Sequence, residues 1–279
     1  MKEINTLIEN QYHLQGLYED IVQRLQEQGI DPKNVTRADI SGVDEFHVRG
    51  AQVSKELTGE FDFQGLTVLD VGCGLGGPCR MLADEFNCHV TGIDMSHEFI
   101  RTAGKLSELV AMNGSTNFVQ GDALDLPFKE ETFDVVWTQH VQMNIENKRK
   151  FYSEIGRVLK DQGTFIYYDI FKTGKGDIHY PVPWANDVSV SFLGTISNME
   201  NILKEEGFSK VQTKNQSSSA IEFLHGLFEK IKASGPPKLG LNVLMGASTR
   251  EKLGNILNGL EDNSIELESG IYKKNADGK

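Results

Sequence analysis

Three acidic residues follow three short apolar segments in the first half of the chain. They are Asp70, Asp94 and Asp122. Each lies at or just after the end of a predicted strand, and open α/β sheets bind ligands outside the carboxyl ends of their strands. Carboxylates accept hydrogen bonds from hydroxyl and amine groups and attract positive charge. We therefore expect these residues to form a small-molecule site at one edge of a sheet.

A glycine-rich turn lies beside the first of these acids. Four of the six residues 72–77 are glycine, and Pro78 follows them. Such a turn lets a ligand approach bare backbone at a helix N-terminus, and proline suits the first helical position. The spacing also fits the G-x-G-x-x-G turn of dinucleotide-binding proteins. However, a carboxylate at Asp70 would repel a pyrophosphate, which favours a cationic ligand over a dinucleotide.

The segment from Asp70 to Gly76 resembles the first motif of the class I methyltransferases that use S-adenosylmethionine (SAM) and act on small molecules. The resemblance runs from about Thr67 to Phe171 and more loosely to the C-terminus. It implies SAM as cofactor and an α/β fold: a Rossmann-like, seven-stranded, mostly parallel sheet with helices on both faces. The layout is most similar to the sarcosine/dimethylglycine N-methyltransferases and to related enzymes that act on quinones and phenols.

The resemblance also implies roles for the cofactor residues. Asp70 would anchor the amino group of SAM, and Asp122 would accept a hydrogen bond from the adenine amine. Asp94 lies 22 positions after Gly72, close to the spacing of about 20 expected for a carboxylate that holds ribose hydroxyls. The expected cofactor-binding residues are Asp70, Gly72, Cys73, Gly74, Asp94, Met95, Asp122, Ala123 and Gln139.

The end of the fourth predicted strand, 133–140, faces the transferred methyl group in proteins with this fold. Three residues are therefore candidates for removing a proton from the acceptor: His140, Tyr168 and His47. We favour His140 because an unperturbed histidine has a pKa near ~6.5, which suits a general base. The alternative is that His140 only forms a hydrogen bond to the cofactor or to a lid.

Aromatic residues are frequent around the predicted reaction centre. Aromatic faces attract ammonium groups, which favours an amine acceptor. The alternative is that these rings fill the core and lid, or hold an apolar ring. Arg49 is the nearest candidate for binding a substrate carboxylate. The expected substrate-binding residues are Trp137, Gln139, His140, Asn144, Tyr168, Tyr180, Trp184 and Arg49; no metal is expected.

The hydrophobic periodicity, together with what the resemblance implies, predicts three regions. Residues 1–60 form a helical cap over the cofactor, with one helix over 3–30. Residues 61–218 form the SAM-binding core, with an aromatic lid loop at 171–195. Residues 219–279 form a helical insertion of two helices and the last strand. The seven strands are expected at 65–71, 88–94, 116–123, 133–140, 164–170, 208–216 and 264–273.

Composition narrows the class of protein and its partners. The net charge of −12 and the lack of a dense basic patch argue against a nucleic-acid binder. No run approaches the ~18 apolar residues that span a bilayer, and the N-terminus lacks the apolar core of a signal peptide. We expect a cytoplasmic monomer or homodimer that has a small-molecule partner and binds neither membrane nor nucleic acid.

The sequence thus favours an enzyme that transfers a methyl group from SAM to a small molecule by in-line displacement. An amine nitrogen is the preferred acceptor atom, and the oxygen or carbon of a phenol or quinone is the alternative. Alignment of the reactants can supply about 7–11 kcal/mol of the barrier without a metal. Two further hypotheses are a nicotinamide-dependent reductase and a SAM-binding protein without catalysis.

Overall fold

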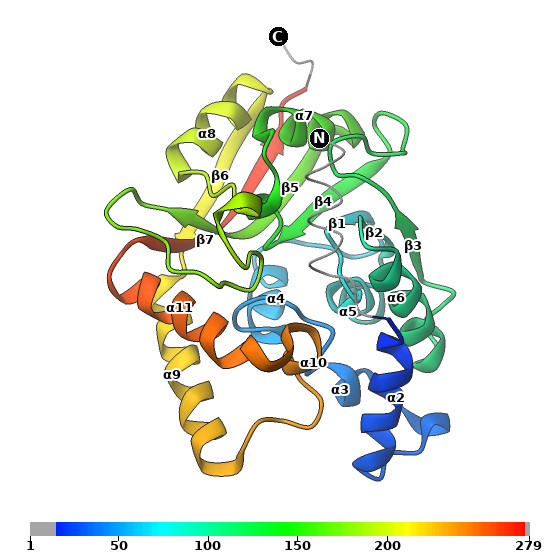
Figure 1. Cartoon of the computed structure of the whole chain (residues 1–279). Coiled ribbons are helices and arrows are strands. Elements are labelled where there is room, and N and C mark those ends of the chain that lie inside the picture. Colours follow the sequence, from blue (N-terminus) through cyan, green and yellow to red (C-terminus); the bar gives the residue numbers. More distant parts are fainter. Residues whose placement is uncertain (1–14, 277–279) are drawn as a thin grey trace.

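A computed structural model describes residues 15–276. In this range seven strands form one sheet in the order β3-β2-β1-β4-β5-β7-β6 (Figure 1). Only β7 runs antiparallel to its neighbours, β5 and β6. The strands are β1 (Thr67–Val71), β2 (His89–Asp94), β3 (Thr116–Gln120), β4 (Phe133–Gln139), β5 (Leu159–Lys172), β6 (Phe208–Asn215) and β7 (Ile265–Lys274). The seven-stranded, mostly parallel sheet confirms the predicted fold class.

The helices alternate with these strands and also precede and interrupt the sheet. The predicted helix over 3–30 begins among residues outside the described range, and its described part is α2. The helices are α2 (Leu17–Glu27), η1 (Pro32–Asn34), α3 (Arg37–Ile40), α4 (Ala51–Thr58), α5 (Gly77–Phe86), α6 (His97–Leu109), η2 (Gln142–Asn144), α7 (Lys148–Val158), η3 (Val188–Val190), α8 (Ile196–Glu205), α9 (Ser217–Ser234), α10 (Asn242–Met245), η4 (Gly246–Ser248) and α11 (Thr249–Glu261).

Most predicted strand ends differ from the structure by one to three residues. The third strand ends at Gln120, so Asp122 lies in the turn that follows. The start of the fifth strand differs more, because β5 begins at Leu159 rather than at residue 164. Leu159 already pairs with Phe133 across a register shift in the β4–β5 ladder. The extra pairing depends on a distant strand and therefore has no local signal.

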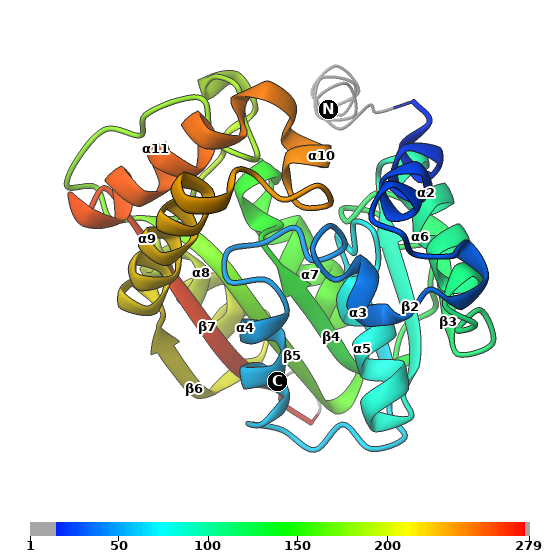
Figure 2. The same cartoon turned by 90° about the horizontal axis from the view of Figure 1, so that it is seen from below.

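The two faces of the sheet are covered by different helices. Along β4, Val135 and Trp137 belong to one apolar cluster and Val136 to the other, as the two-residue period of a strand requires. The first cluster includes residues of α4, α5, α9 and α11, and the second includes residues of α7 and α8. Figures 1 and 2 show these two helical layers on opposite sides of the sheet.

The segment before α4 is fixed to the glycine-rich turn by a buried ion pair. Arg80, on α5, has no exposed surface and donates to Asp44 over 2.8 Å and to the Leu75 carbonyl oxygen over 2.5 Å. The Gly77 N–H also donates to the Asp44 carbonyl oxygen over 3.1 Å. A Cβ on Gly77 would lie 2.4 Å from that oxygen, so only glycine permits this approach.

We expect Arg80→Met to destabilise the fold strongly, because it leaves the Asp44 carboxylate buried without its cation. Removing one partner of a buried pair typically costs about 3–5 kcal/mol. The matched control is Arg37→Met, which removes a more exposed pair with Asp84 and should cost less than about 1 kcal/mol. Urea unfolding of both variants measures the difference, and equal losses would contradict this role for the Arg80 pair.

Candidate functional site

The glycine-rich turn leaves one side of its backbone open. Gly72 has a φ of 75°, and a Cβ there would lie 2.4 Å from a methyl group of Val141. Gly74 also has a positive φ, of 52°, but nothing lies within 4 Å of the position a Cβ would take. The Gly74 N–H donates to the Asp94 carboxylate over 3.0 Å. The turn is therefore packed at Gly72 and open to a ligand at Gly74.

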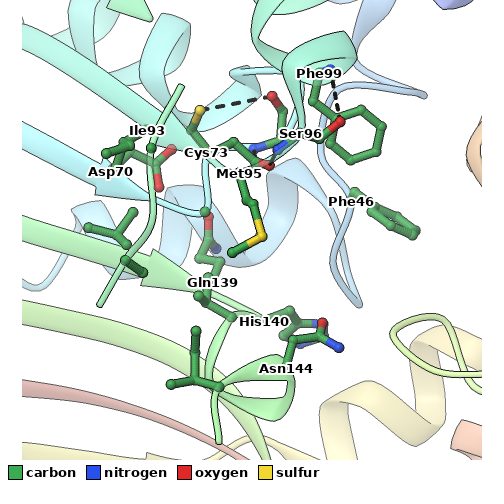
Figure 3. Close-up of a pocket in the computed structure, with 18 of the residues that line it drawn as sticks. Phe46, Asp70, Cys73, Ile93, Met95, Ser96, Phe99, Gln139, His140 and Asn144 are labelled. Atoms are coloured by element: carbon green, nitrogen blue, oxygen red, sulfur yellow. Dashed lines mark hydrogen bonds between the residues drawn. The ribbon is translucent and has the colours of Figure 1, made fainter. Parts of the chain in front are cut away.

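A cavity of about 160 Å³ lies against this turn, at the carboxyl ends of β1, β2 and β4. Figure 3 shows residues of the turn, of the β2 end and of the β4 end around one open centre. All nine residues expected to bind the cofactor line this cavity, although they come from four separate segments of the chain. The structure thus brings them together, and their individual contacts with a cofactor stay predictions.

The three cavity acids that were expected to bind the cofactor differ in environment. Burial raises the pKa of Asp70 to about 7, even though the Cys79 thiol donates to its carboxylate over 3.2 Å. Burial also raises the pKa of Asp94, whose oxygens accept from backbone N–H groups of Gly74 and Ser96. Asp122 accepts from the Leu124 N–H over 2.8 Å. A ligand with positive charge would compensate this concentration of buried carboxylates.

His140 lies directly after β4 in the left-handed region, with a φ of 53°. Its ring stacks on Tyr168 with centroids 5.1 Å apart and meets the His47 ring edge-on at 6.0 Å. Burial holds the pKa of His140 well below its usual range, so the ring is neutral near pH 7. Its Nε2 atom and the Tyr168 hydroxyl are buried without a hydrogen-bond partner among the described residues. Two orphaned polar atoms therefore lie next to each other at this strand end.

His47 belongs to a hydrogen-bonded cluster between the cap segment, which comprises residues 41–50, and the end of β4. Its Nε2 lies 3.2 Å from the Ser54 hydroxyl, 3.2 Å from the Gln139 amide nitrogen and 3.3 Å from a carboxylate oxygen of Glu45. Burial lowers the pKa of His47 to about 4, whereas burial and the charge of Asp44 raise that of Glu45 to about 8. Near neutral pH the cluster therefore consists of a neutral imidazole and a protonated carboxyl.

The turn after β4 is held by buried polar groups that do not line the cavity. The Asp169 carboxylate accepts from the N–H groups of Val141 and Gln142. The ammonium group of Lys148 donates to the carbonyl oxygens of Gln142, Ile145 and Phe192. Because Phe192 belongs to the 171–195 loop, this lysine also fixes the loop to the turn.

Only part of the predicted substrate-binding set reaches a cavity. Gln139, His140 and Asn144 line the first cavity. The Asn144 amide also donates to the carbonyl oxygens of Trp184 and Val190 and thereby binds the 171–195 loop. The members of the predicted set that line neither of the two cavities described here are Trp137, Tyr168, Tyr180, Trp184 and Arg49.

The aromatic residues lie inside the core for a physical reason. Trp137 faces the α4–α5 side of the sheet, packs on Phe63 at 5.7 Å and donates through its indole N–H to Gln139. Trp184 is buried, and its indole N–H donates to Ser191. Arg49 is also buried, and it pairs with Glu56 and donates to Gln216. The two indole N–H groups and the terminal nitrogens of Arg49 are satisfied within the protein, and none of the three residues lines a described cavity.

A second and larger cavity, of about 650 Å³, lies between the cap segment and the helical insertion. Phe46, His47 and His140 line both cavities, which places the two side by side at the end of β4. The wall formed by the insertion is mostly apolar. Its apolar members are Phe223, Leu224, Leu227, Ile231, Pro236, Pro237, Leu239, Leu241, Met245, Ala247, Leu253 and Ile256.

Sequence reasoning missed this second cavity and one aromatic residue of the first, Phe99. A signal for the cavity was present in α9. This helix has apolar residues on more than one side, yet only Ala220 and Leu224 of its 18 residues are buried. A helix that carries more apolar surface than it packs indicates a ligand or a partner.

The comparisons with known proteins agree with this geometry. Residues 69–167 match the family model described as "Methyltransferase domain". The chain contains a class I SAM-dependent methyltransferase domain. The cavity fits SAM, because the buried carboxyl group of Asp70 faces it without an ion-pair partner among the described residues, and the open side of Gly74 admits a ligand against the backbone.

Two curated relatives match part of this chain. The chain is 38% identical over 109 residues to the sterol 24-C-methyltransferase ERG6B of Gibberella zeae. This match covers 39% of this chain and 29% of that protein. It is 38% identical over 105 residues to the 2-methyl-6-phytyl-1,4-hydroquinone methyltransferase of Synechocystis sp., covering 38% of this chain and 32% of that protein. The matched segments are thus about a third of these relatives.

The whole fold is similar to that of a Galdieria sulphuraria protein assigned as a sarcosine dimethylglycine methyltransferase. The TM-score is 0.68 at 17% sequence identity, and the match covers 92% of this chain and 98% of that one. This likeness extends through the cap and the helical insertion, and at this identity it concerns the fold alone. Within residues 15–276, no group of three or more His, Cys, Asp or Glu side chains is arranged to hold a metal ion.

We expect Asp94→Ala to weaken SAM binding sharply, because the variant loses a half-buried carboxylate that also accepts from the N–H groups of Gly74 and Ser96. Hydrogen bonds to charged groups are worth about 1.5–3 kcal/mol, which corresponds to a loss of roughly 10- to 150-fold in affinity. Calorimetric titration with SAM measures the effect. Asp62→Ala, outside the cavity, is the control, and wild-type affinity in Asp94→Ala would refute the ribose role.

We also expect the affinity for SAM to rise with pH through the pKa of Asp70. Below about pH 7 this carboxyl is protonated in the free protein, so a cationic ligand must displace a proton; above it, no such cost remains. The dissociation constant should fall about eightfold from pH 6 to pH 7.5. Titrations across this range on wild type and Asp70→Asn test the assignment, and the same slope in both proteins would exclude Asp70.

Proposed function

We propose that this protein transfers a methyl group from SAM to an apolar small molecule, at a carbon or an oxygen atom. The observation that carries the proposal is the second cavity. It has the size of a small-molecule site, its wall is mainly apolar, and it adjoins the first cavity at His47 and His140. An acceptor held there would have one end beside the residues at the tip of β4.

The names of the curated relatives support the same acceptor class. One is described as acting on a sterol carbon and the other on a prenylated hydroquinone, and both names describe largely apolar molecules. The aligned segments cover less than two fifths of this chain. The support for an apolar acceptor therefore comes first from the cavity and second from these names.

The residues of this chain would contribute position and polarity rather than covalent chemistry. SAM supplies the methyl group. Asp70, Asp94 and Asp122 would hold the amino, ribose and adenine groups of the cofactor, and the open backbone at Gly74 would lie against it. The buried walls exclude water, which strengthens each polar interaction inside the site. Holding donor and acceptor in line supplies most of the catalysis that such a displacement needs.

His140 is the residue best placed to act on a hydroxyl acceptor. Its neutral ring and unpartnered Nε2 can accept a hydrogen bond from the hydroxyl and take its proton as the bond to the methyl group forms. His47, which also lines both cavities, lies beside it and would orient the acceptor or share the proton. For methylation at carbon, the same polar atoms would face the charge that develops on the acceptor.

An amine acceptor is the second candidate. The overall fold resembles that of a protein assigned as a sarcosine dimethylglycine methyltransferase. The cage of aromatic rings that favoured an amine in the sequence has less support, because Trp137, Tyr168, Tyr180 and Trp184 line neither described cavity. Phe46 and Phe99 remain as rings that an ammonium group could contact.

The other two hypotheses have weaker support. A nicotinamide-dependent reductase would place a pyrophosphate beside the buried carboxylate of Asp70, which is unfavourable. A SAM-binding protein without catalysis would have little use for a large apolar cavity that opens beside His140. Within the described residues, no helix is both long and apolar enough to cross a bilayer. A cytoplasmic location, a monomer or homodimer, and the absence of membrane and nucleic-acid partners stay expectations.

The test is release of S-adenosylhomocysteine from SAM by the purified protein with a panel of acceptors. We expect turnover with apolar phenols, hydroquinones or alkenes, and little with glycine-derived amines. With a phenolic acceptor, His140→Ala should lower kcat by about 100-fold and leave SAM affinity within about threefold. His225→Ala, on the exposed side of α9, is the control. Turnover with amines alone would refute the proposed acceptor class.

A further inference from the structure

The second cavity contains one charged residue whose role its surroundings do not explain. Arg250, an exposed residue near the start of α11, lines the cavity beside apolar residues of the insertion. No described residue forms a hydrogen bond or an ion pair with it. The seven other arginines of the described residues each form an ion pair, so an arginine without an acidic partner is unusual on this protein.

A second polar group on the same wall also lacks a partner. The side-chain oxygen of Asn242, at the start of α10, is buried without a hydrogen-bond partner among the described residues. Buried polar atoms are almost always hydrogen-bonded, so such an atom calls for an explanation. Because the two ends of an amide are assigned rather than observed, this group can present either an acceptor or an N–H donor to a ligand.

The position of these two residues separates them from the reaction centre. Asn242 and Arg250 line the second cavity but not the first, whereas His47 and His140 line both. An acceptor that fills the second cavity would therefore place its reacting end at the histidines and another part of its body at Asn242 and Arg250. Between the two groups of residues, the insertion wall is apolar.

We propose that the apolar acceptor carries an anionic oxygen group, a carboxylate or a phosphate, which Arg250 binds with help from the Asn242 amide. A guanidinium group matches both anions with paired N–H donors. The net negative charge of the chain would otherwise disfavour an anionic ligand, so a local cation in the cavity has a clear use. The inference rests on the proposed function and narrows its acceptor class to amphipathic molecules.

Calorimetric binding of simple probes tests this assignment without turnover. The probes are decanoate, decyl phosphate and decanol, each below its micelle-forming concentration. We expect one or both anions to bind about tenfold more tightly than decanol, and the preferred anion to identify carboxylate or phosphate as the group. Arg250→Gln should abolish the preference, and Arg250→Lys should keep much of it because the charge is retained.

Two further variants complete the design. Asn242→Asp should weaken anion binding because it places a carboxylate beside the negatively charged group of the ligand. Lys230→Gln removes a positive charge from α9 at a residue that does not line the cavity, and it should leave all three affinities unchanged. Equal affinity for the three probes, no binding of any probe, or an undiminished preference in Arg250→Gln would overturn the proposal.

Binding of SAM and release of S-adenosylhomocysteine are measured on the same preparations. Absence of methyl transfer together with anion selectivity that depends on Arg250 would defeat the proposed function and leave this subsite standing. Methyl transfer to neutral apolar acceptors, with no dependence on Arg250, would support the proposed function and refute the anion subsite. The two proposals can therefore fail separately.

Discussion

The buried pair between Arg80 and Asp44 is the interaction on which the site depends. Arg80 lies under the glycine-rich turn and reaches the Leu75 carbonyl oxygen, residues of α6 and the cap segment at once. Asp44 in turn receives the Gly77 N–H through its backbone oxygen. The cap segment therefore cannot shift without disturbing the turn. Because His47 follows Asp44 by three residues, the same pair determines where that histidine meets the end of β4.

A second constraint is the number of buried carboxyl groups around the first cavity. Burial raises the pKa of Asp44, Glu45, Asp70 and Asp94, and Arg80 is the cation that directly compensates one of them. When these carboxyl groups ionise, their charges are poorly hydrated, and this lowers the stability of the folded protein. A cationic ligand would relieve that cost. The unfavourable burial of these carboxylates thus favours the binding of a positively charged ligand.

The sequence predicted the parts of this site that follow from local pattern. The acids at strand ends, the glycine-rich turn and the order of strands and helices all depend on residues close together in the chain. The aromatic residues were predicted less well, because the same rings suit either a core or a lid. Trp137 is in the core because a two-residue period turns it toward α4 and α5, and that face is covered by a segment 80 residues earlier in the chain.

The second cavity could not be predicted because it is formed between distant segments. Its walls come from residues 41–50, from the end of β4 and from 223–256, and nothing in the local sequence tells how far apart these segments pack. What the sequence did carry was an excess of apolar side chains on α9 over those that the fold buries. In a protein that also has a SAM-type cavity, that excess indicates a ligand more readily than a packing defect.

His47 and His140 line both cavities, and the walls of these cavities differ in chemistry. The acids at the strand ends line one cavity, and the insertion offers apolar surface in the other. The Nε2 atom of His140, which is buried without a partner among the described residues, belongs to a residue that lines both. Under the proposed function, the core of the sheet can stay constant for one cofactor, while changes in the insertion would alter the acceptor without touching the residues that hold the methyl donor.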